Sequence, residues 1–128
     1  MMSLQSPFSV GSPVDSWWNG LRSHINRSIE LLAHSPSFDA PADAARFLQI
    51  VESHYSFVQR APYPQEAEVA REYLLVSFRY LCDSFRSQSQ SAHADSDQAY
   101  EFAYHKFMMF TQTLLSRGIY EPDPTTLH

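Results

Sequence analysis

Residues 69–85, VAREYLLVSFRYLCDSF, decide the fold class of this chain. Two neighbouring apolar stripes follow the three- and four-residue spacing of a helix: Val69, Tyr73, Val76 and Tyr80 on one, and Leu74, Phe78, Leu81 and Phe85 on the other. A helix that is apolar over so wide an arc is normally covered on more than one side. The stretch therefore predicts a long helix, over about residues 64–89, that packs against several neighbours.

Three further helices are expected around it, over about residues 15–34, 40–60 and 95–117. They are separated by the proline-containing breaks HSPSFDAP and APYP and by the polar run SQSQSAHADSD. In the last helix, Asp95 has the character of an N-cap residue and Gln98 stands three positions later, as in a capping box. Short connections favour antiparallel neighbours in contact. The sequence predicts an all-α, up-down-up-down four-helix bundle.

The chain length of 128 residues favours a single domain, expected over residues 14–118. Residues 1–13 are rich in serine and proline and are expected to form a flexible leader, and residues 119–128 an irregular tail. The N-terminus has neither a basic start nor an apolar run, and no segment approaches the ~18 consecutive apolar residues of a membrane span. We therefore expect a soluble, cytoplasmic protein.

Charge and cysteine content argue against several classes of function. The net charge is −5, and the eight arginines are scattered singly, whereas nucleic-acid binders usually cluster basic residues on one face. Cys82 is the only cysteine, so neither an intramolecular disulfide framework nor a CxxC zinc site can form. No glycine-rich phosphate loop or G-x-S-x-G motif is present. Nucleic acid is not an expected partner, and no cofactor is expected.

A ribonuclease activity is one alternative. Arg86 is followed, after six residues, by His93. In this spacing and in its helical content the chain resembles the HEPN superfamily of dimeric helical RNases and toxins, whose signature is an Arg, four to six residues and a His. The resemblance implies that Arg86 would stabilise charge on a phosphate and that His93 would transfer a proton. The residues between them are Ser, Gln and Ala, and the stretch has the composition of an interhelical linker.

A metal or small-ligand site is a second alternative. His24, His54 and His105 fall on three different predicted helices, and Glu101 precedes His105 by four residues, on the same helical face. Bundles do build metal sites from inward-facing Glu and His. However, neither HExxH nor a paired ExxH is present, and partly buried histidines that bond a neighbour explain the pattern equally well.

The surplus of apolar surface favours a third class of function. Two inward stripes are expected on the helix that contains YEFAYHKFMMF (residues 100–110): Ala103, Phe107, Phe110 and Leu114, and beside them Tyr100, Tyr104, Met108, Thr111 and Leu115. Phe102 and Met109 face away from both stripes. Large exposed apolar patches usually mark association, although a thick aromatic core would also use these residues.

The leading hypothesis is a non-enzymatic interaction or regulatory module. It would be a homodimer, or would bind another protein, through the two aromatic-rich helices 64–89 and 95–117. The expected contact residues are Phe78, Phe85, Phe102, Met109 and Phe110. A deep pocket lined by His and Arg would favour the ligand or enzyme alternatives, and a flat aromatic patch would favour interaction.

Overall fold

The computed structural model describes residues 13–34 and 41–116. Four α-helices and one 3-10 turn make up this part: α1 (Pro13–Ala33), α2 (Pro41–Arg60), η2 (Gln65–Ala67), α3 (Glu68–Ser89) and α4 (His93–Ser116). The expected all-α four-helix bundle is confirmed. Of the expected leader, residues 1–13, Pro13 is the first residue of α1 and the other residues lie outside the described part, as does the expected tail, residues 119–128.

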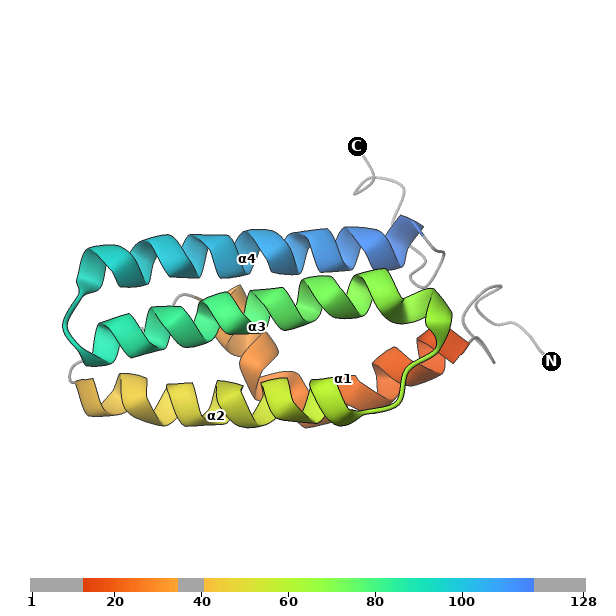
Figure 1. Cartoon of the computed structure of the whole chain (residues 1–128), viewed down its shortest axis with the longest axis horizontal. Coiled ribbons are helices and arrows are strands. Elements are labelled where there is room, and N and C mark those ends of the chain that lie inside the picture. Colours follow the sequence, from red (N-terminus) through yellow and green to blue (C-terminus); the bar gives the residue numbers. More distant parts are fainter. Residues whose placement is uncertain (1–12, 35–40, 117–128) are drawn as a thin grey trace.

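The helices form a layer of three with the fourth behind it. Figure 1 shows α2, α3 and α4 side by side, with α3 in the centre, each running antiparallel to the next, while α1 crosses obliquely behind them. Within the layer, α3 packs most extensively against α4 and then against α2. One face of the layer is thus covered by α1. We call this the inner face, and the opposite one the outer face.

Small side chains bring α3 and α4 close together. Ala70, Ser77 and Ser84 repeat every seven residues on α3 and are all buried. Seven residues are close to two helical turns, so the three lie along one line. Ser84 Oγ donates a hydrogen bond to the carbonyl oxygen of Ser96 on α4 at 2.9 Å. This line of small residues explains why the α3–α4 contact is the most extensive in the bundle.

The turn between α3 and α4 is residues 90–92, three residues where the predicted helices left five, residues 90–94. The backbone N–H of Ala92 donates to the Ser87 carbonyl at 2.8 Å and that of Ser91 donates to Gln88 at 3.0 Å. With Ser91 at a φ of 62°, this is a Schellman ending. Helix α4 consequently begins at His93, and Asp95 lies in its first turn. The predicted N-cap at Asp95 is wrong, because the tight turn starts the helix two residues earlier.

Helix α1 covers the inner face with large side chains. The buried apolar residues of α1 are Val14, Trp17, Trp18, Leu21, Ile25, Leu31 and Leu32. Trp18 meets Phe110 of α4 edge to face, with ring centroids 4.9 Å apart. Near the other end, Tyr100 Oη donates to the Leu32 carbonyl at 2.8 Å, and burial raises the pKa of the Tyr100 hydroxyl. Bulky residues thus fill the space that an oblique crossing leaves.

None of the helices within residues 13–34 and 41–116 is both long and apolar enough to cross a membrane.

Candidate functional site

One of the two apolar stripes of α3 lies on the outer face. Leu74, Phe78, Leu81 and Phe85 are fully buried, whereas Val69 is 48% exposed. The rest of its stripe is half-buried: Tyr73, Val76 and Tyr80. On the neighbouring helix α4, Phe102 is 45% exposed and Met109, two turns further along the same line, is half-buried. Together these six residues form an apolar strip, which we call the outer strip.

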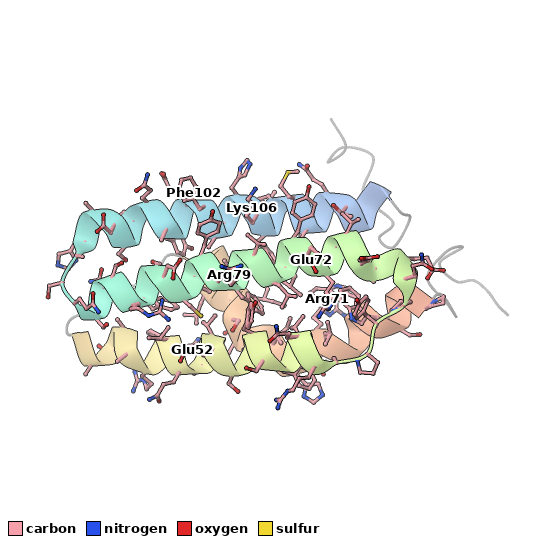
Figure 2. The ribbon with its side chains drawn as sticks, in the orientation of Figure 1. Glu52, Arg71, Glu72, Arg79, Phe102 and Lys106 are labelled. Carbon is pink, nitrogen blue, oxygen red and sulfur yellow. The ribbon has the colours of Figure 1, made fainter. Side chains whose placement is uncertain are left out.

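The outer strip contains a groove between α3 and α4 of about 300 Å³. It is lined by Glu68, Val69, Glu72, Tyr73, Val76 and Lys106. The two carboxylates come from α3, and the ammonium group, from the only lysine of the chain, comes from α4. Phe102 lies further along the same pair of helices, where its ring centroid is 5.3 Å from that of Tyr80. Figure 2 shows Phe102 and Lys106 on α4, next to Glu72 and Arg79 on α3.

A second, larger groove of about 490 Å³ lies between α2 and α3. It is lined by Glu52, Tyr55, Ser56, Arg79, Cys82, Asp83 and Arg86. Arg86 pairs with Asp83 (2.9 Å) and with Glu52 (3.5 Å), so its charge is largely compensated. No histidine of the described residues lines this groove. It lacks the combination of His and Arg that the ligand and enzyme alternatives require.

Cys82 carries the thiol group of this second groove. Burial, together with the nearby Glu52 carboxylate, raises the pKa of the thiol to about 12. The thiolate is the nucleophilic form, so a thiol that stays protonated at neutral pH is unreactive. The groove therefore offers no activated cysteine.

Three of the five predicted partner contacts lie in the core. Phe78, Phe85 and Phe110 are fully buried, so they present no surface to a partner in this fold. Their periodicity is that of the inner face, which α1 and the neighbouring helices cover. Phe102 and Met109 are the two predicted contacts that the structure leaves accessible.

The stripe of α4 that contains Tyr100, Tyr104 and Met108 was expected to face inward, and only part of it does. Tyr100 points to α1, but Tyr104 is 45% exposed and Met108 is 39% exposed. The oblique course of α1 leaves these two side chains uncovered, on the flank of α4 away from the outer strip. They form a separate, smaller apolar area.

The histidines considered for a metal site are not gathered into one. His54 Nδ1 lies 2.6 Å from Oγ of the buried Ser28, and the ring of the exposed His24 packs on Phe57. Burial, and secondarily the charge of His24, lowers the pKa of His54. His105 and Glu101 are exposed on α4. Among the described residues, no three His, Cys, Asp or Glu side chains are grouped so that they could hold a metal ion.

The two residues of the ribonuclease alternative have separate partners. Arg86 is held by carboxylates of α2 and α3, whereas His93 Nδ1 lies 3.1 Å from Oε1 of Gln88 at the α3–α4 turn. His93 is the first residue of α4 and not part of a linker. Two carboxylates beside Arg86 disfavour a phosphate there.

The sequence did not predict that the residues lining the α3–α4 groove lie together. Lys106 and Glu72 each fall on a charged sector of their own helix, and only the antiparallel packing of α3 on α4 brings them together.

Comparison of the chain with protein-family models, with curated proteins and with solved structures found no match.

Proposed function

We propose that this protein is a non-enzymatic interaction or regulatory module that forms a homodimer through the outer strip of α3 and α4. The observation that carries the proposal is the strip itself: six neighbouring valine, aromatic and methionine residues, half-buried or exposed, on the face of the layer that α1 does not cover. Aromatic residues and methionine are enriched in interface cores, and contiguous apolar surface on a soluble domain usually marks association.

The occupant of the strip is a second copy of this chain. The groove within the strip is lined by the acidic Glu68 and Glu72 of α3 and by the basic Lys106 of α4, so one copy offers both signs of charge to another. Two-fold dimers use the same patch on both subunits, which requires such self-complementarity. A cytoplasmic location belongs to the same proposal and is supported by a single, buried, free cysteine.

Sedimentation equilibrium and light scattering across the micromolar range test the proposal. Wild-type protein is expected to show a monomer–dimer equilibrium, and Phe102→Ser is expected to shift it towards monomer. Tyr104→Ser is the matched control, because Tyr104 is equally exposed, lies on the same helix and belongs to the other flank. A wild-type protein that stays monomeric at the highest concentrations would refute the homodimer.

The enzymatic alternative has its own test. Purified protein is expected to leave single-stranded RNA intact. Cleavage that disappears in both His93→Ala and Arg86→Ala, with unchanged circular dichroism, would replace the proposal by the ribonuclease hypothesis.

A further inference from the structure

We propose that two copies pack outer face to outer face, with their α3 helices antiparallel, so that Phe102 of each copy enters the α3–α4 groove of the other. This inference rests on the proposed homodimer and specifies its geometry. It follows from two independent features, the position of an exposed aromatic ring beside an apolar groove and the order of charges along α3.

The first feature is a ring and a groove that match in chemistry. Phe102 is a large apolar side chain that is 45% exposed, and the groove is floored by Val69, Tyr73 and Val76. An enclosed apolar cavity of about 150 Å³ already accommodates benzene. The groove, at about 300 Å³, has room for a phenyl ring. The ammonium group of Lys106 at its edge can approach the face of such a ring.

The ring cannot fill the groove of its own chain. Phe102 packs beside Tyr80, and the groove is centred near Tyr73, seven residues earlier on α3. At 1.5 Å per residue this offset is about 10 Å along the helix. A two-fold axis that lies in the interface, perpendicular to α3 and close to Val76, exchanges the two positions. It places each ring over the groove of the other copy, which is the reciprocal contact of an isologous dimer.

The second feature is the order of charges on the exposed ridge of α3. Glu68 and Glu72 lie in its first half and Arg79 in its second half. A two-fold axis near Val76 places Glu72 of each copy opposite Arg79 of the other. Within the described residues, neither Arg79 nor Lys106 forms an ion pair, so both cations are available for partner carboxylates. Lys106 lies near the same axis, where the glutamates of both copies offset the two ammonium groups.

The charge order gives a test that no general loss of apolar surface can imitate. Glu72→Arg alone and Arg79→Glu alone are each expected to weaken self-association by about tenfold, because each places like charges opposite one another in both symmetric contacts. A one-to-one mixture of the two variants is expected to form heterodimers with near wild-type affinity. The double variant Glu72→Arg/Arg79→Glu is expected to recover homodimers. Sedimentation equilibrium measures all four samples.

The ring and the axis are tested separately. Phe102→Ser is expected to weaken the dimer about 30-fold or more, as removal of a central aromatic contact does, while Tyr104→Ser leaves it unchanged. Val76→Cys in a Cys82→Ala background is expected to give a disulfide-linked dimer under mild oxidation, because a residue beside the axis meets its own copy. Val69→Cys in the same background, away from the axis, is the control that should stay unlinked.

The outcomes separate the two proposals. A monomeric wild type overturns both the homodimer and this geometry. A wild-type dimer that shows no rescue in the charge-swapped mixture and no cross-link at Val76→Cys overturns the geometry and leaves the homodimer standing. Rescue together with the cross-link supports both.

Discussion

The two faces of the α2–α3–α4 layer use the same helix in opposite ways. On its inner side, α3 presents Leu74, Phe78, Leu81 and Phe85, all fully buried. On its outer side it presents Val69, Tyr73, Val76 and Tyr80, which remain half-buried or exposed. Both stripes have the same helical periodicity. The difference between them is that α1 lies over the inner face, whereas no helix within the described residues lies over the outer face.

The side-chain chemistry of the two stripes agrees with this difference. The inner stripe contains only hydrocarbon groups, whereas half of the outer stripe is tyrosine, whose hydroxyl group can stay hydrated in the monomer and bond a partner in a complex. A surface that alternates between water and a partner needs such residues, because a purely hydrocarbon surface of that size promotes aggregation.

The largest expected effect comes from the inner face. Trp18→Ala removes a ring that is 3% exposed and packs edge to face on Phe110. It is expected to lower the free energy of unfolding by about 3–5 kcal/mol, as other large-to-small core substitutions do. Urea unfolding followed by circular dichroism measures this. If the loss is no greater than that of an outer-face substitution such as Tyr80→Ala, α1 does not cover the core as described.

The second-largest loss of stability is expected from a substitution in the contact between α3 and α4. Ser84→Leu places a bulky side chain in the line of small residues, opposite Ser96. Overpacking of this kind is expected to cost about 1–3 kcal/mol of unfolding free energy. Ser84→Ala keeps the close approach and loses only the hydrogen bond, at about 1 kcal/mol. Equal thermal stability of the two variants would show that the helices are not held together by small residues.

The contact between α1 and α2 should respond to pH through His54. Its pKa in the folded protein is lowered from 6.5, chiefly by burial and then by the charge of His24. The unfolded chain therefore binds the proton more readily, and this contribution to stability is complete above pH 6.5 and is lost as the pH falls below it. His54→Gln is expected to flatten the dependence of stability on pH between 7 and 5 more than His24→Gln does, as measured by urea titrations. An unchanged slope in His54→Gln would assign the dependence to other groups.

The smallest expected effect is that of Phe102→Ser on the monomer. The ring is nearly half exposed, so its replacement is expected to change the unfolding free energy of the monomer by no more than about 0.5 kcal/mol. Unfolding at a concentration at which sedimentation shows only monomer measures this. A large loss of monomer stability would mean that the outer strip contributes to the fold, and the effect of this variant on association would then need another explanation.

The helices themselves could be predicted from the sequence, because prolines and polar runs end them and apolar spacing defines their faces. Which neighbouring helix covers each face could not be predicted from the sequence. Periodicity gives the direction of a stripe within its own helix but not the position of the neighbour that covers it, so Phe78, Phe85 and Phe110 were assigned to a surface although they form the core. The seven-residue repeat of Ala70, Ser77 and Ser84 was the available signal for the α3–α4 contact.

Neither the first residue of α4 nor the α3–α4 groove could be predicted, because both depend on backbone geometry and helix register that the composition does not reveal. The Schellman turn places Ser91, rather than a glycine, in the left-handed region, and so the polar run looked like a longer linker. Lys106 and Glu72 are far apart in sequence and line the same groove only through the register of two antiparallel helices. In the same way, Arg86 and His93 are close in sequence but are held by different partners.

The location of Lys106 has a practical consequence for experiments on this protein. It is the only lysine in the chain, so reagents that acylate amines, such as those used to attach dyes or to immobilise proteins on sensor surfaces, will modify it and the terminal amine alone. Acylation removes the positive charge and fills the edge of the α3–α4 groove. A protein immobilised through Lys106 would have the proposed dimer surface blocked, and Lys106→Arg, which keeps the charge but resists acylation, is the form to use for such measurements.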